Sequence, residues 1–399
     1  MKKICFWTPY IGNVGTIKAT IHSAEAIKKY AKDDVEIGLF KIHSEWEGYE
    51  KDIKQHNLNI IDFNLKKYFK TLPKYGILSR ITMIIIMLYS IPKLIKYFNT
   101  SKPDTLISYL QGITPLISRM FSKHKPKIIL SIQGLPSFLA DAEIYSTYPL
   151  WKKIEAKLRI FIWKKIYLKA DKIITLTQKT QKNLIELLNS NKDKIIYIPN
   201  PIIDDTILQR SKEKIDEALF LENDYVLAIG RYTRQKDFTT LIKAFKIVLE
   251  KQPNIKLIIL GEGEERIQLQ STIDDLNLTD SIYLYGFVTN PYKYLAKARL
   301  FVLSSLWEDQ GHTLVEAVSL KVPVLSTKCP SGQEELLSYG KAGYLCDIGD
   351  EKDMANKILK ALENNNQDKI ELAYQNSLQF TGEEFYNNLE KVIKEFYEN

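Results

Sequence analysis

Short apolar runs alternate with helical patterns along the whole chain, and this alternation restricts the fold more than any other feature. Runs at residues 3–8, 35–42, 59–63, 105–109, 127–132, 172–176 and 194–198 are followed by runs at 225–229, 255–260, 282–285, 300–303 and 322–325. Strands that alternate with helices favour a parallel, doubly wound sheet. A chain of 399 residues is too long for one ordinary core. The sequence therefore predicts an α/β fold with two Rossmann-like domains.

The first series of runs ends at a proline-rich segment, which marks the expected domain boundary. Ile198-Pro199-Asn200-Pro201 carries two prolines, and a charged stretch follows it to Glu222. We expect one domain over residues 1–200 and a second over residues 201–379. A last helix is expected over residues 380–399, because Phe385, Leu389, Val392 and Phe396 recur at helical spacing.

Residues 300–325 predict a strand, a polar loop, a helix over about 313–320 and a second strand. In such a unit the loop and the helix start lie at the carboxyl edge of a parallel sheet, where backbone N–H groups favour an anion. Two carboxylates, Glu308 and Glu316, lie in this unit. Thr313-x-x-Glu316 also fits a capping box, in which both side chains only close the helix start. A structural role and a binding role for Glu316 both remain open.

Two other loops follow predicted strands and carry residues suited to a phosphate. Gly230-Arg231 with Lys236 offers cations that can neutralise a diphosphate, although a solvated surface loop would look the same. Gly12 and Gly15 follow the first strand, where glycine lets the backbone approach a phosphate closely. An ordinary tight turn is the alternative there.

These motifs together resemble the retaining glycosyltransferases of family 4, which have the GT-B fold. The resemblance rests on Trp307-Glu308-x-x-Gly311-x-x-x-Glu316-Ala317, on residues 322–327, on Cys329-Pro330-Ser331-Gly332-x-x-Glu335, and on Gly230-Arg231 with Lys236. It implies two domains that face a cleft and a C-terminal helix that crosses back to the first domain. It also implies catalytic roles for Arg231 and Lys236, which grip the diphosphate, and for Glu308, which contacts the donor sugar.

The resemblance further implies a set of donor-binding residues. Glu316 would hold the ribose hydroxyls, and the turn after the run at 282–285 would lie near the base, unless it is a simple turn. His312 would contact the donor, although a lone histidine in a loop is more often only solvated. The set is Gly12, Gly15, Gly286, Phe287, Val288, Gly311, His312, Thr313, Leu314 and Glu316.

The sequence offers no evident metal site. None of its five histidines has a metal-ligand spacing, and no Asp-x-Asp occurs. We therefore expect no metal and no cofactor, with the diphosphate charge met by Arg231, Lys236 and the amides at residues 311–314.

The expected reaction moves a sugar from a nucleoside diphosphate sugar, with UDP the expected nucleotide, to an acceptor hydroxyl with retention at the anomeric carbon. In the resembled family the leaving phosphate is described as drawing the acceptor proton. Gln133 stands where several members carry a histidine, so no base is assigned. The expected acceptor is a membrane-linked or cell-surface glycan precursor, as in lipopolysaccharide or capsule. The alternatives are a soluble acceptor, or a non-catalytic sugar-nucleotide sensor whose basic half binds lipid or nucleic acid.

Charge is distributed unevenly along the chain. The formal net charge of +8 divides into +17 for residues 1–200 and −9 for residues 201–399. A basic half indicates an anionic partner. Because no nucleic-acid motif is evident, we expect an anionic membrane surface instead. Residues 66–102 and 151–169 read as basic amphipathic surfaces. Alternatively, their apolar faces pack on the first sheet and the lysines form a solvated rim.

The expected location is cytoplasmic and peripheral on the inner face of the cell membrane. Three unpaired cysteines suit a reducing compartment, and the N-terminal apolar run is too short for a signal peptide. The apolar run at 81–91 is expected to stop at Pro92, short of the roughly 20 residues that a membrane span needs.

Overall fold

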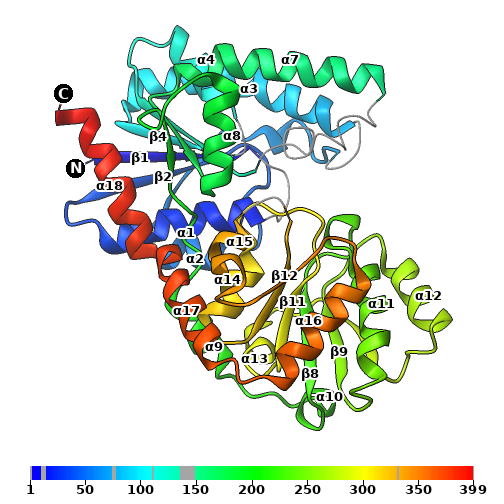
Figure 1. Cartoon of the computed structure of the whole chain (residues 1–399). Coiled ribbons are helices and arrows are strands. Elements are labelled where there is room, and N and C mark those ends of the chain that lie inside the picture. Colours follow the sequence, from blue (N-terminus) through cyan, green and yellow to red (C-terminus); the bar gives the residue numbers. More distant parts are fainter. Residues whose placement is uncertain are drawn as a thin grey trace. The chain divides into compact units, whose positions relative to one another are not determined.

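A computed structural model describes residues 2–9, 15–73, 78–109, 112–134, 149–329 and 332–398. The chain forms two compact units (Figure 1). Unit 1 comprises residues 1–201 and 382–399, and unit 2 comprises residues 202–381.

Unit 1 is built on a seven-stranded parallel sheet, which we call sheet 1. Its order is β3-β2-β1-β4-β5-β6-β7. Most residues in five of its strands are buried, as expected where helices cover both faces of a parallel sheet. The strands are β1 (Lys2–Trp7), β2 (Val35–Lys41), β3 (Asn59–Asp62), β4 (Thr105–Ser108), β5 (Lys127–Ile132), β6 (Lys172–Thr175) and β7 (Ile195–Tyr197).

Helices cover both faces of sheet 1, and the two buried clusters identify which helix lies on which face. One cluster joins the sheet to α1 (Gly15–Tyr30), α2 (Glu50–Gln55) and α18 (Gly382–Glu398). The other joins it to α3 (Leu78–Ser101), α4 (Thr114–Phe121), α7 (Leu150–Ile166) and α8 (Gln178–Leu188). The second group forms one helical layer over its face of the sheet.

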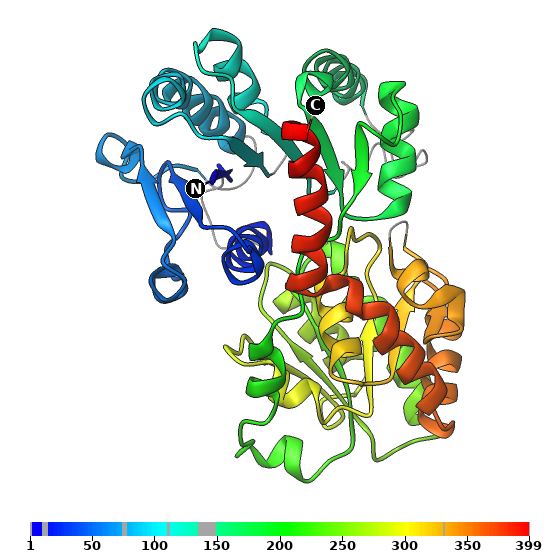
Figure 2. The same cartoon turned by 90° about the vertical axis from the view of Figure 1, so that its left-hand side faces the viewer.

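The C-terminal helix returns to unit 1, which confirms the expected crossover. Helix α18 lies beside α1 in both views (Figure 1, Figure 2). Gly382 begins α18 against α1, where an added Cβ would lie 3.2 Å from the Tyr30 ring and 3.3 Å from Ala26 Cβ. Phe385 and Leu389 enter the same buried cluster as α1.

The expectation that Pro92 ends the apolar run is wrong, because α3 continues through it to Ser101. Core contacts hold the helix on both sides of the proline: Ile86 before it and Leu94 and Phe98 after it are buried against the sheet. Residues 81–101 are long and apolar enough to cross a membrane by length and composition alone. With one side of α3 committed to the core of unit 1, the folded unit does not offer this helix to lipid on all sides.

Unit 2 contains a six-stranded parallel sheet, sheet 2, with the order β10-β9-β8-β11-β12-β13. Its strands are β8 (Tyr225–Ile229), β9 (Lys256–Leu260), β10 (Ile282–Gly286), β11 (Leu300–Leu303), β12 (Val324–Thr327) and β13 (Tyr344–Cys346). The sequence predicted the first five of these strands and missed β13. That strand has only three residues, and its pairing with β12 is what identifies it.

Helices also cover both faces of sheet 2, as two buried clusters show. One cluster holds α11 (Phe238–Leu249), α12 (Arg266–Asp275) and α16 (Glu351–Glu363). The other holds α10 (Ala218–Leu221), α13 (Tyr292–Leu295), α14 (His312–Ser319), α15 (Gln333–Leu336) and α17 (Gln367–Ser377). Helix α9 (Asp205–Ser211) packs against α13. The chain therefore holds two doubly wound α/β layers, as predicted.

Leu389→Ala should destabilise unit 1, because Leu389 is fully buried where α18 joins the core. A leucine-to-alanine change in a core costs about 2–5 kcal/mol. Denaturant unfolding would measure the loss. Leu158→Ala is the matched control in the same unit, because Leu158 is 58% exposed. Equal stability of the two variants would contradict the packing of α18 on unit 1.

Candidate active site

Sheet 2 has its topological switch point between β8 and β11. From β8 the chain runs outward to β9 and β10, and it then returns to the other side of β8 to form β11 (Figure 1). Crevices at the carboxyl ends of such neighbouring strands are where open α/β sheets bind ligands. The two loops that leave this point are residues 230–237 after β8 and residues 304–311 after β11. They contain four of the predicted site residues: Arg231, Lys236, Glu308 and Gly311.

Lys236 and Glu308 meet across the switch point. Lys236 Nζ lies 2.5 Å from Glu308 Oε1, and their side chains are only 17% and 11% exposed. Ser305 Oγ donates a hydrogen bond to the same carboxylate oxygen at 2.7 Å. Because an ammonium group has three N–H donors, Lys236 keeps capacity to bind an anion while Glu308 fixes its position.

The backbones of the two loops are also tied together. Leu306 N donates to Gln235 O at 2.8 Å, and the Gln235 side chain donates to Trp307 O at 2.8 Å. Ser304 Oγ donates to Lys236 O at 2.6 Å. The sequence alone did not identify Gln235 or the Ser304-Ser305 pair as parts of the site. Ser304 and Ser305 directly follow a predicted strand and Gln235 lies in the loop after another, which was the available signal.

Glycines allow the loops after β8 and β9 to touch. An added Cβ at Gly261, whose φ is +144°, would lie 1.8 Å from Gly230 O, and one at Gly263 would lie 2.3 Å from Tyr232 O. Tyr232 is fully buried beneath these loops, and its hydroxyl donates to Ile259 O at 2.9 Å. Burial raises the pKa of Tyr232 to about 12, so this tyrosine supports the loop as a neutral hydrogen-bond donor.

Helix α14 begins at Gly311, and this start overturns the capping-box interpretation. Gly311 is the N-cap residue with φ +66°, and no side chain caps the helix. Thr313 is therefore the second helical residue and cannot act as the cap. The side-chain amide of Gln333 occupies the space beside Gly311, where an added Cβ would lie 2.5 Å from it.

The predicted residues in the first turn of α14 differ in their surroundings. Leu314 lies fully buried in the core, and its amide donates to Gly311 O at 2.9 Å. His312 and Thr313 precede it as the first two helical residues. Within the described residues, the buried hydroxyl of Thr313 has no hydrogen-bond partner. A buried hydroxyl without a partner costs free energy, which makes Thr313 Oγ1 a candidate ligand contact.

Glu316 lies on the buried side of α14. It is 6% exposed, and its Oε1 accepts a hydrogen bond from the Tyr292 hydroxyl at 3.1 Å. Tyr292 comes from α13, a short helix that no sequence motif identified. This hydrogen bond helps to hold the carboxylate in place on the buried side of α14.

The remaining predicted residues of unit 2 lie at the same edge of the sheet. Arg231 is exposed directly after Gly230. Gly286 ends β10 with φ +99°, a conformation that favours glycine, and it accepts from Gly261 N at 2.8 Å. Phe287 is 75% exposed beyond it, and Val288 is partly buried.

The two residues predicted in the loop after β1, Gly12 and Gly15, belong to unit 1. Gly15 is the first residue of α1. Gly12 lies outside the described residues.

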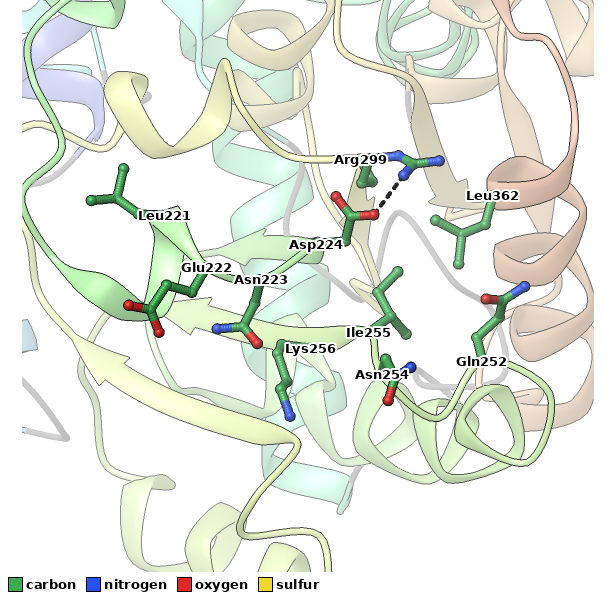
Figure 3. Close-up of a pocket in the computed structure, with 10 residues that line it drawn as sticks. All are labelled: Leu221, Glu222, Asn223, Asp224, Gln252, Asn254, Ile255, Lys256, Arg299 and Leu362. Carbon is green, nitrogen blue, oxygen red and sulfur yellow. Dashed lines mark hydrogen bonds and ion pairs between the residues drawn. The ribbon is translucent and has the colours of Figure 1, made fainter.

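A polar pocket lies at the opposite edge of sheet 2 (Figure 3). Its lining includes Asp224 before β8, Lys256 at the start of β9 and Arg299 before β11. Arg299 pairs with Asp224 at 2.7 Å. Because ligands of open α/β sheets bind at the carboxyl edge, this pocket is not the candidate active site.

The described part of the chain contains no group of three or more His, Cys, Asp or Glu side chains placed to hold a metal ion. The loop after β8, residues 230–237, carries three cations at the switch point: Arg231, Arg234 and Lys236.

Comparison with known proteins gives two family matches that follow one another along the chain. Residues 47–206 match the model described as Glycosyltransferase Family 4, and residues 209–376 match Glycosyl transferases group 1.

Among curated proteins, an uncharacterized glycosyltransferase of Methanocaldococcus jannaschii is 33% identical over 376 residues, which covers 84% of this chain and 86% of that protein. The N-acetylgalactosamine-N,N'-diacetylbacillosaminyl-diphospho-undecaprenol 4-alpha-N-acetylgalactosaminyltransferase of Campylobacter jejuni is 28% identical over 261 residues, 65% of this chain and 66% of that one.

A solved structure shows the same fold. Anabaena HepE in complex with UDP-glucose superposes with a TM-score of 0.69 and 17% identity, over 99% of this chain and 100% of that one. The two parallel-sheet α/β units thus form the GT-B fold that the family resemblance implied.

Thr313→Val should leave the free energy of unfolding unchanged or raise it by about 1 kcal/mol, because it removes a buried hydroxyl that has no partner. The same change should weaken UDP binding, measured by calorimetry. Thr327→Val is the matched control. Its hydroxyl donates to Ser305 O at 2.6 Å, so this variant should lose about 1–3 kcal/mol of stability. A stability loss in Thr313→Val as large as in Thr327→Val would restore a structural role for Thr313.

Glu316→Gln should weaken binding of UDP and GDP by about 1.5–3 kcal/mol, because ribose hydroxyls lose a charged acceptor. Tyr292→Phe removes the hydrogen bond to Glu316 but keeps the carboxylate, so it should reduce stability more than nucleotide affinity. Calorimetric titration of both variants separates the two effects. Unchanged affinity in Glu316→Gln would leave Glu316 with a structural role only.

Proposed function

The chain belongs to the group 1, family 4 glycosyltransferases, and on that premise we propose that it transfers a sugar from a UDP-sugar to a glycan acceptor with retention and without a metal ion. The observation that carries this proposal is the Lys236–Glu308 pair at the switch point of sheet 2. It puts a positioned cation at the edge where open α/β sheets bind phosphates.

The donor is proposed to bind along the carboxyl edge of sheet 2. Lys236 and Arg231 would neutralise the diphosphate, and the start of α14 would add backbone amides and the Thr313 hydroxyl. Glu316 would accept from the ribose hydroxyls. The base would lie near Gly286-Phe287-Val288, where the exposed Phe287 ring offers a stacking surface.

The chemistry follows from the charge that develops during transfer. As the bond between the sugar and the diphosphate breaks, negative charge builds on the leaving phosphate, and a positioned ammonium group stabilises it more than it stabilises the bound donor. Glu308 would fix Lys236 for this task and contact the sugar. The leaving phosphate oxygen would then accept the proton of the acceptor hydroxyl. At the same time the acceptor oxygen would bond to the anomeric carbon on the face from which the phosphate leaves.

The acceptor is proposed to be a membrane-linked precursor of a surface glycan, such as lipopolysaccharide or capsule, handled on the cytoplasmic face of the cell membrane. The name of the Campylobacter jejuni relative describes a substrate carried on diphospho-undecaprenol. The excess of positive charge in residues 1–200 also supports an acceptor held at an anionic surface.

A donor panel tests the proposal most simply. Purified protein is incubated with UDP- and GDP-sugars, with and without glycan acceptors, and the products are identified by mass spectrometry. Transfer, or slow donor hydrolysis, from at least one UDP-sugar is expected. Nucleotide binding without turnover of any donor would favour a non-catalytic sensor, and transfer only to water-soluble acceptors would remove the lipid-linked acceptor.

Arg231→Ala and Lys236→Ala should each lower turnover about 100-fold, because each removes a positive charge from the leaving diphosphate. Turnover should fall more than the half-saturating donor concentration rises, because charge grows towards the transition state. Lys246→Ala, an exposed lysine on α11, is the control and should retain activity. Activity should also survive added EDTA. A preparation that is active only with Mg²⁺ or Mn²⁺ would contradict the metal-free site.

A further inference from the structure

Helix α7 of unit 1 directs most of its large apolar side chains away from the core. Its buried face is narrow and includes Ala156 and Trp163. The apolar side chains on its other face are between 52% and 75% exposed: Leu150, Trp151, Ile154, Leu158 and Phe161. A surface helix of a soluble domain normally shows polar residues on that side. The alternative that the apolar face of residues 151–169 packs on the sheet holds for Trp163 and Tyr167, which are buried, and is wrong for the four exposed residues from Trp151 to Phe161.

Cations are interleaved with this exposed apolar ridge. Lys157, Lys164 and Lys165 are exposed on the same helix. Residues 150–166 contain six cations and one acid, Glu155, and Arg159 pairs with that acid at 3.2 Å. The outer face of α7 is thus apolar and strongly positive at once, the combination that suits an anionic lipid–water interface.

Helix α3 adds a second apolar ridge to the same helical layer. Ile81, Ile84 and Leu88 recur at helical spacing and are 53%, 53% and 61% exposed, while Ile86 is buried against the sheet. Both helices cover the same face of sheet 1 (Figure 1). Their exposed ridges therefore lie on the outer side of one layer, opposite to the face that α1 and α18 cover.

We propose that the outer surface of α7, extended by α3, docks unit 1 on an anionic bilayer as an interfacial contact. The apolar ridge enters the headgroup region, and Lys157, Lys164 and Lys165 contact lipid phosphates. The buried sides of α3 and α7 stay on sheet 1, so neither helix spans the bilayer. Docking would bring unit 1 to a lipid-linked acceptor, and in this respect the inference rests on the proposed function.

Cosedimentation of the full chain with vesicles tests the proposal. Binding to phosphatidylglycerol vesicles should exceed binding to phosphatidylcholine vesicles and should fall as salt rises. Each cation near the surface contributes about fivefold to binding. A triple variant, with Lys157→Gln, Lys164→Gln and Lys165→Gln, should therefore bind on the order of 100-fold more weakly.

A charge-matched control comes from the other face of unit 1. Lys51 and Lys54 on α2 and Lys391 on α18 are exposed, and both helices pack on the opposite side of sheet 1. Changing these three lysines to Gln alters net charge by the same amount and should leave binding within a few fold of the wild type. An equal loss in both triple variants would overturn the assignment to α7, because only net charge would then matter.

The apolar ridge has its own test. Ile154→Gln, Leu158→Gln and Phe161→Gln together should reduce binding to both kinds of vesicle without loss of stability, because all three side chains are exposed. Trp151 fluorescence should be quenched by bromine-labelled acyl chains, and Trp151→Leu should abolish most of that quenching. Absence of quenching would overturn the insertion of α7.

Two further measurements distinguish lipid binding from self-association and the docking proposal from the proposed function. If the wild type self-associates without vesicles and the apolar variant is monomeric, the ridge is an interface between copies of this chain and the lipid proposal fails. Calorimetric UDP binding reports on the proposed donor site and needs no vesicle. Loss of vesicle binding with intact UDP binding leaves the proposed function standing, whereas vesicle binding without turnover of any donor overturns the proposed function only.

Discussion

The ion pair between Lys236 and Glu308 is the contact on which the proposed chemistry depends. The two residues lie 72 positions apart, and the return of the chain from β10 to β11 brings them together across the switch point. A lysine side chain in a loop loses much conformational freedom when it must hold one position. The carboxylate of Glu308 already holds Lys236 in place without a donor, and the Ser305 hydroxyl in turn holds that carboxylate. The site is therefore organised by contacts within unit 2.

Close backbone contacts keep this arrangement rigid. Gly261 and Gly263 let the loop after β9 touch the loop after β8, and any side chain at Gly261 would collide with Gly230 O. Gly311 turns the chain into α14 in a left-handed conformation. Unit 1 differs in its surface, because apolar side chains of α3 and α7 are exposed on its outer helical layer. We infer that one unit holds the donor while the other meets the membrane.

The sequence predicted twelve of the thirteen strands in the described part of the chain, because short apolar runs that alternate with helical patterns favour a sheet covered on both faces. It missed β13, whose three residues are too few to show a period. It ended the apolar run at Pro92, but buried contacts of Ile86, Leu94 and Phe98 outweigh the cost of proline in α3. It left a Thr313–Glu316 capping box open as one of two interpretations, but the left-handed Gly311 starts the helix two residues before Thr313. The roles of Lys236 and Glu308 came from family resemblance, since spacing alone cannot bring distant residues together.

A crystal structure of the protein soaked with a UDP-sugar would test the central claim most directly. The account predicts the diphosphate within hydrogen-bonding distance of Lys236 Nζ and of the first amides of α14, with the ribose hydroxyls at Glu316. It would be contradicted by a nucleotide bound at the opposite edge of sheet 2, in the pocket beside Asp224 and Arg299. A diphosphate held by a metal ion, with Lys236 still paired only to Glu308, would contradict it equally.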